Sequence, residues 1–249
     1  MIHYHGLPIN PQTAAVKAIE HGHAFVSFAD TSPLRMAITV CQSIAIDNGA
    51  FSAWRIGKPI KNWRKYYEFA RECIRIPICD FAIIPDVING TEEENNALLT
   101  EWPLPRWFGV PVWHMHESLD RLERLASDWP RIAIGSSEEY REIGTTRWWV
   151  RMNSAMKVIC EQDGRPIPRV HGLRMLNPKI FTRLPLSSAD STNIARNVGI
   201  DKAWNGTYQP PSKEVRAMVM RERIEAHNAP TRFFETTHQT IPTLQDSLL

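Results

Sequence analysis

Short apolar runs recur along the chain, and a polar or glycine-containing turn follows each of them. The runs hold four to six residues, which is typical of buried strands and too short for most helices. A further strand is predicted to end at Asp190, within Leu186–Ser191. The other predicted strands are Ala24–Phe28, Ser43–Ile46, Phe81–Ile84, Val110–Trp113, Arg131–Ile134 and Val170–Met175.

Between several of these runs, apolar residues recur at the spacing of a helix face. Ser118 is placed to cap one such segment, because a serine side chain accepts from the first free backbone N–H groups of a helix. The predicted helices are Asn62–Ile74, Glu92–Glu101, Ser118–Ser127 and Ser212–His227. From about Ala229 the chain mixes Pro, Thr and His, and an irregular C-terminal tail is expected.

Strands that alternate with helices imply parallel βαβ units. A chain of 249 residues with at least six such strands favours an α/β fold of the (β/α)₈ TIM-barrel type, as a single domain spanning residues 1–249. An open, doubly wound sheet is the alternative, since periodicity alone does not separate the two folds.

Composition places the chain among soluble proteins. Hydrophobic residues make up 43% of it, and no apolar run approaches the length of a membrane span. Its four cysteines form no CxxC pair, which suits a reducing, cytoplasmic setting and suggests neither a disulfide framework nor a zinc knuckle. The net charge of +2 permits a polyanionic partner without requiring one.

Polar residues at the strand ends are the candidate chemistry, because the active site of a (β/α)₈ barrel forms where strands give way to loops. Taken one at a time, an aspartate there is most often a helix cap or turn residue. His114 and His116 alternate along an extended segment, but no further ligand motif accompanies them, so no metal is expected. The strand-end residues are Asp47, Asp86, His114, His116, Gly135, Ser136, Ser137, His171, Gly172 and Asp190.

Three of these residues are carboxylates at three different strand ends, which converge in space in a barrel. Convergent carboxylates suit glycosidic bond cleavage, where one acts as nucleophile and another as acid and base. A third can accept the ring N–H groups of a purine-like base, and Phe51 is placed to stack on that base. No role is assigned to His114, His116 or His171.

The order of these motifs resembles the tRNA-guanine transglycosylase superfamily, most closely its phage and bacterial branch that inserts 7-deazaguanine bases into DNA. The likeness covers about residues 40 to 200 and rests on four short motifs. They are the acid-Ser-Gly-Gly-aromatic-Gln signature at Asp47–Ser52, the acid after a buried strand at Asp86, the Gly-rich turn at Ala133–Ser137, and an Asp six residues before an Arg at Asp190 and Arg196.

The resemblance implies a mechanism and a site. Asp190 would attack C1′ of a deoxyguanosine, and Asp47 would be the general acid and base. The base would be held by Phe51, Ser52, Asp86, Gly135 and Ser136. The incoming base would be a free 7-deazaguanine, foremost the 7-cyano form, and no cofactor is implied.

The chain departs from the family pattern in three places. Ala50 replaces the second Gly and Ser52 replaces the Gln, so contacts to the base differ. The tRNA enzymes also carry a CxCxxC zinc subdomain, which this sequence lacks, and its loss favours DNA over RNA as the substrate.

Basic residues follow the Asp47 motif closely, interleaved with aromatic ones, and they are the predicted nucleic-acid-binding set together with Arg196. A solvated helix face is the alternative interpretation of such a charge run. The set is Arg55, Lys58, Lys61, Arg64 and Lys65. Two other functions stay open: a transglycosylase acting on RNA or a hydrolytic base excisor, and a non-enzymatic nucleic-acid-binding barrel.

Overall fold

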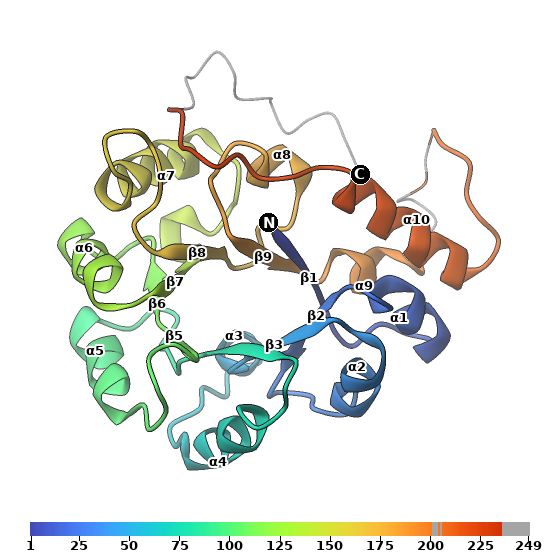
Figure 1. Cartoon of the computed structure of the whole chain (residues 1–249), viewed down its shortest axis with the longest axis horizontal. Coiled ribbons are helices and arrows are strands. Elements are labelled where there is room, and N and C mark those ends of the chain that lie inside the picture. The colour runs from blue at the N-terminus through green and yellow to red at the C-terminus, as the bar shows by residue number, and fades with distance from the viewer. Residues whose placement is uncertain (201–203, 205, 236–249) are drawn as a thin grey trace.

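A ring of parallel strands forms the centre of the molecule, and helices surround it (Figure 1). This computed structural model describes residues 1–200, 204 and 206–235. The strands of that part of the chain are β1 Ile2–Gly6, β2 His23–Ser27, β3 Ser43–Asp47, β4 Cys79–Ile83, β5 Gly109–Val110, β6 Val112–His114, β7 Arg131–Gly135, β8 Arg169–Gly172 and β9 Ser188–Ser191.

The sheet closes almost completely into a barrel. Its order is β5-β4-β3-β2-β1-β9-β8-β7-β6, with every pairing parallel, so β5 and β6 stand at its two ends. Only Pro111 separates these two strands in the chain, and its carbonyl still accepts from the N–H of Ala133 at 2.8 Å. The ring therefore has eight strand positions, and the predicted single-domain (β/α)₈ fold is confirmed in place of the open sheet.

The predicted strands correspond to β2 through β9, with three differences. The stretch Val110–Trp113 is divided at Pro111, because proline has no N–H to donate to a neighbouring strand. The run Val170–Met175 ends as a strand at Gly172. Strand β1 was missed, because its sequence IHYHG alternates histidines with apolar residues and contains no apolar run.

The four predicted helices are confirmed within a few residues as α4, α5, α6 and α10. Ser118 caps α6 as expected, accepting from the N–H of Arg121 at 3.1 Å. The helices described are α1 Gln12–Ile19, α2 Leu34–Val40, α3 Ala50–Arg55, α4 Arg64–Cys73, α5 Glu92–Glu101, α6 Leu119–Asp128, the 3₁₀ helix η1 Glu138–Tyr140, α7 Thr146–Ile159, α8 Pro178–Phe181, α9 Asn193–Asn197 and α10 Lys213–Glu225.

Two hydrophobic clusters follow from the alternation of side chains along each strand. The outer cluster packs strands against helices and includes Ile44 and Ile46 of β3. The inner cluster fills the barrel and includes Ala45 of β3. Asp47 stands two residues after Ala45, so the same alternation turns its carboxylate inward at the mouth. The inner cluster consists of Tyr4, Phe25, Ala45, Phe81, Ile83, Val110, Val112 and Ala133.

The C-terminal part of the described chain runs back over the barrel. Helix α10 packs against α1, and His5 of β1 lies 3.0 Å from the carboxylate of Glu225. Residues 229–235 contain neither helix nor strand, and the rest of the predicted irregular tail lies outside the described residues. No helix in the described ranges is both long and apolar enough to cross a membrane.

Candidate active site

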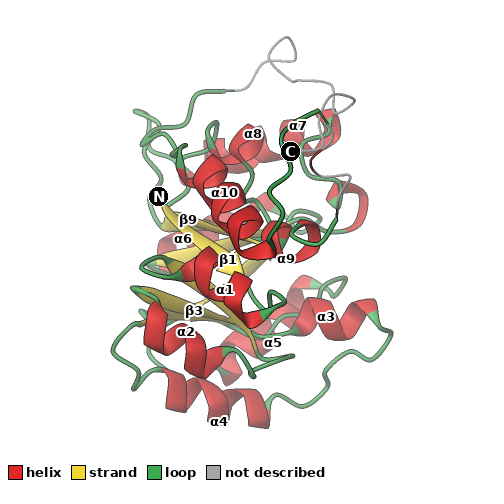
Figure 2. Cartoon of the chain, turned by 90° about the vertical axis from the view of Figure 1, so that its right-hand side faces the viewer, coloured by secondary structure: helices red, strands yellow, loops and turns green. Residues whose placement is uncertain are grey.

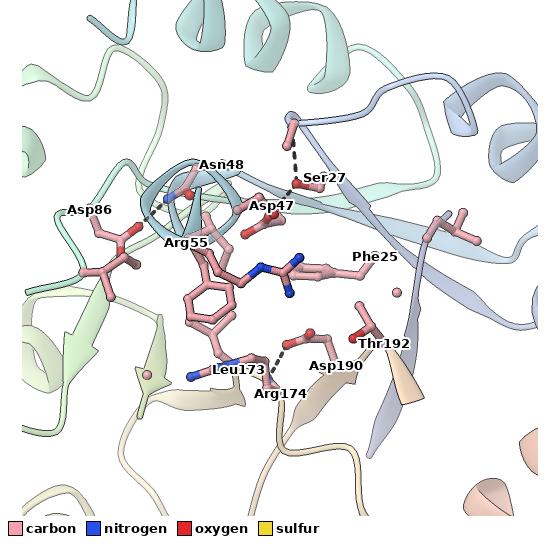
Figure 3. A pocket seen from close by; sticks show the side chains of 18 of the residues that line it. Phe25, Ser27, Asp47, Asn48, Arg55, Asp86, Leu173, Arg174, Asp190 and Thr192 are labelled. Atoms are coloured by element: carbon pink, nitrogen blue, oxygen red, sulfur yellow. Dashed lines mark hydrogen bonds between the residues drawn. The ribbon is translucent and has the colours of Figure 1, made fainter. Parts of the chain in front are cut away.

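A cavity of about 330 Å³ opens at the carboxyl ends of the strands. Helix α3, which follows β3 directly, lies beyond this end of the sheet in the side view of Figure 2. The cavity brings together nine residues that the sequence predicted for the site: Asp47, Phe51, Ser52, Arg55, Asp86, Gly135, Ser136, Asp190 and Arg196. The three carboxylates therefore converge, as the barrel interpretation requires (Figure 3).

Asp47 is the last residue of β3 and is partly buried, rather than an exposed residue of the following loop. Its Oδ2 accepts from the Ser27 hydroxyl at 2.7 Å and from the N–H of Gly49 at 3.1 Å. Loss of solvent raises the pKa of Asp47 to about 6, and the nearby charges of Asp190 and Asp86 add to that rise against the two hydrogen bonds. Such a carboxyl can both give and take a proton near neutrality.

The segment after Asp47 is a helix rather than an extended turn. Gly49 stands before the helix with φ +81°, and a Cβ there would approach the N of Ala29 to 3.0 Å, so glycine is needed. Phe51 and Ser52 lie on α3 and line the cavity. The guanidinium of Arg174 lies over the Phe51 ring, with its central carbon 4.3 Å from the ring centroid.

Asp86 lies three residues beyond β4 and is 7% exposed. Its Oδ1 accepts from Asn48 at 2.6 Å and its Oδ2 contacts His114 Nε2 at 2.7 Å. Asn48 also donates to the carbonyl of Ile84 and accepts from Ala50, which fixes its amide orientation and joins the end of β3 to the end of β4. Asp86 is therefore held firmly at the cavity wall, where its remaining lone pairs can accept from a ligand.

Asp190 comes from β9 and is 5% exposed. Its Oδ1 accepts from the backbone N–H of Arg174 at 2.9 Å, and His171 Nε2 lies 3.4 Å from the same oxygen. His171 is fully buried in the barrel beneath, where its Nδ1 contacts the Ser188 hydroxyl at 2.8 Å. No described residue donates to Oδ2 of Asp190, so this oxygen is available for attack on a substrate carbon.

Gly135 and Ser136 form the cavity wall at the end of β7. A Cβ on Gly135 would meet His114 Nδ1 at 3.1 Å, so the glycine lets the histidine ring pack closely. The Ser136 hydroxyl is used internally, since it accepts from Trp148 Nε1 at 2.9 Å. The carbonyl of Ser136 accepts from the Arg174 guanidinium at 2.9 Å.

The predicted basic set divides into two groups. Arg55 and Arg196 are exposed and line the cavity, and the Arg55 side chain extends across the view of the pocket in Figure 3. Four others are exposed but do not line the cavity, and one of these, Arg64, is paired with Glu68 at 3.0 Å. These four are Lys58, Lys61, Arg64 and Lys65.

Several other cavity residues had no predicted role. Ser27 and Phe25 project inward from β2 at alternate positions, a signal that the period of two in the predicted strand contained. Arg174 was hidden inside the overlong predicted strand Val170–Met175, while Asn48 lies within the Asp47–Ser52 motif and Thr192 lies between Asp190 and Arg196. His114 also lines the cavity.

His114 and His116 both contact other groups of the protein. Their rings stack at 5.8 Å, and His116 contacts the Ser137 hydroxyl at 2.7 Å and the carbonyl of Gly90 at 3.1 Å. Within the described ranges, no three His, Cys, Asp or Glu side chains gather closely enough to hold a metal ion. No protein-family model matches the sequence, and no curated protein matches it at a significant level.

Proposed function

We propose that the protein is a DNA guanine transglycosylase, which exchanges guanine in DNA for a 7-deazaguanine base, most directly 7-cyano-7-deazaguanine. One observation carries the proposal: Asp47, Asp86 and Asp190 come from three strand ends and line one cavity large enough for a purine. Their environments differ. Asp86 is engaged at both oxygens, Asp190 has one oxygen free, and Asp47 has a pKa of about 6.

In the first step, Oδ2 of Asp190 attacks C1′ of the target deoxyguanosine. The bond from C1′ to N9 breaks, its electron pair goes to the base, and protonated Asp47 gives that base a proton. A covalent aspartyl–sugar intermediate remains. In the second step, Asp47 takes the N9 proton of the incoming base, which attacks C1′ and displaces Asp190. One N-glycosidic bond replaces another, so no redox change occurs.

Asp86 and the stacking surface of Phe51 hold the base during both steps. Asp86 accepts N–H groups of the pyrimidine edge, as acceptor groups do in enzymes that hold an extruded base. Extruding a guanine from a duplex costs a few kcal/mol, which contacts to the backbone must offset. Arg55 and Arg196, which are exposed at the cavity, are the cations that would supply them.

The decisive experiment incubates the protein with DNA, or in parallel with tRNA, and with labelled 7-cyano-7-deazaguanine. Label in DNA supports the proposal. Label in tRNA alone indicates the RNA enzyme, and release of guanine with no incorporation indicates a hydrolytic excisor. Absence of both label and released base from every substrate would sink the enzymatic proposal.

A further inference from the structure

The guanidinium of Arg174 has no part in the steps proposed above, although it lines the same cavity. Arg174 stands in the turn after β8 and is partly buried. Burial lowers the pKa of its guanidinium, and the charge of Asp190 opposes that shift. A buried guanidinium is stable where hydrogen-bond acceptors contact it.

Three contacts hold Arg174 in place, one made by its backbone and two made by its guanidinium. Its backbone has φ +59°, a left-handed conformation that is strained for arginine, and its N–H is bound by Asp190. The guanidinium packs on Phe51 at 4.3 Å and donates to the carbonyl of Ser136 at 2.9 Å. The described residues offer it no other acceptor, so the remaining N–H donors of a fixed, planar fork are available to a ligand.

The order of groups around the cavity matches the edges of a guanine-type base. Asp86 follows β4, Gly135 and Ser136 follow β7, Arg174 follows β8, and Asp190 lies in β9. Around the base, the N1–H and amino donors come first, then O6, then position 7, then N9 with the sugar. When the donors face Asp86 and the sugar carbon faces Asp190, O6 and position 7 face Arg174.

We propose that Arg174 is a specificity-determining residue that donates to O6 and to an acceptor at position 7 of the base. This inference rests on the proposed function. A guanidinium fork fits the O6 and N7 acceptors of guanine, as in readout of guanine by arginine in DNA grooves. The nitrile nitrogen of 7-cyano-7-deazaguanine is also an acceptor, whereas unsubstituted 7-deazaguanine presents only a C–H.

Equilibrium binding of the free bases to the full chain, measured by calorimetry, tests the assignment. We expect guanine and 7-cyano-7-deazaguanine to bind about tenfold more tightly than 7-deazaguanine, because the last leaves a donor unpaired. Arg174→Met keeps the side-chain length and the cover on Phe51 but removes the donors, so the three affinities should become nearly equal.

Arg106→Met is the matched control. Arg106 also packs on an aromatic ring, that of Trp129 at 5.1 Å, and donates to one carbonyl, that of Asp128 at 3.1 Å, but it does not line the cavity. That variant should keep the wild-type preference. Arg174→Lys, which keeps the charge and loses the fork, should reduce the preference and serves if the Met variant does not fold.

Equal affinity of the wild-type protein for the three bases, binding of none of them, or an unchanged preference in the Arg174 variants overturns the inference. The proposed function fails separately. Base preference that depends on Arg174, together with no exchange into DNA, removes the transferase and leaves the base site. Exchange into DNA without a base preference that depends on Arg174 supports the transferase and removes Arg174 as the specificity-determining residue.

Discussion

The backbone N–H of Arg174 donates to Oδ1 of Asp190 at 2.9 Å, and this contact distinguishes the two oxygens of the carboxylate. Oδ1 of Asp190 is oriented by a backbone N–H in the turn after β8, while Oδ2 has no donor among the described residues. A nucleophile held through one oxygen presents the other in a single direction, which is how positioning lowers a barrier.

Asp190→Asn is therefore expected to abolish exchange, by about 10³-fold or more, while its amide oxygen still accepts from Arg174. Base exchange into DNA measures the loss, and a denaturing gel without incoming base reports the protein–DNA adduct, which should vanish in the variant. Asp30→Asn is the control, because Asp30 also lines the cavity but is exposed and accepts from the N–H of Ser32. Wild-type exchange by the Asp190 variant would refute the covalent step.

The two half-reactions should depend on pH in opposite directions. Release of guanine needs protonated Asp47, so its rate should fall as pH rises through about 6. Attack by the incoming base needs ionised Asp47, so that rate should rise through the same pH. Single-turnover release and capture of the preformed intermediate measure the two steps. If the rates of the two half-reactions changed with pH in the same direction, Asp47 would not be the acid of one step and the base of the other.

Asp47→Asn should also change stability in a predictable direction. The folded pKa of about 6 lies above the ordinary aspartate pKa of 3.8, so the folded state binds more protons and wild-type stability falls as pH rises across that window. The variant lacks this loss and should be more stable at pH 8 by up to about 3 kcal/mol. Denaturant unfolding at pH 4 and pH 8 tests this. A lower stability of the variant at pH 8 would mean that its hydrogen bonds dominate.

The fold was predictable because the chemistry of its elements is local. An apolar run marks a strand buried on both faces, and Ser118 marks a helix start. Strand β1 escaped because two of its five residues are histidines, one bound to Glu225 and one contacting the carbonyl of His227, more than 200 residues away in the chain. Such contacts leave no trace in local periodicity.

The carboxylates of the site were predictable for the same reason, since each stands near the carboxyl end of a strand. Their environments were not. The pKa of Asp47 depends on burial and on Ser27, and the placement of Arg174 depends on a left-handed turn that shortens a predicted strand. These features arise from tertiary packing, which a pattern of residue types does not contain.

Arg55 should contribute more to DNA binding than Lys58, Lys61, Arg64 and Lys65, because it lines the cavity and they do not. Arg55→Ala is expected to weaken binding uniformly across sequences and to reduce the salt slope of log K by about one. Arg75→Ala is the control: Arg75 follows the C-terminal end of α4, next to the start of β4 and so away from the cavity. Fluorescence titration at several salt concentrations measures both. Equal slopes for Arg55→Ala and wild type would remove Arg55 from the phosphate contacts.

Ser27 is expected to set the pH at which Asp47 changes its charge. Its hydroxyl donates to Asp47 Oδ2 at 2.7 Å and so lowers the pKa of that carboxyl against the effect of burial. Ser27→Ala removes the donor, and the midpoints of both half-reactions should move to higher pH together. Ser52→Ala is the control, because this hydroxyl lines the same cavity from α3 and has no hydrogen bond to Asp47 among the described contacts. A fall in rate without a shift in midpoint would limit Ser27 to a structural role.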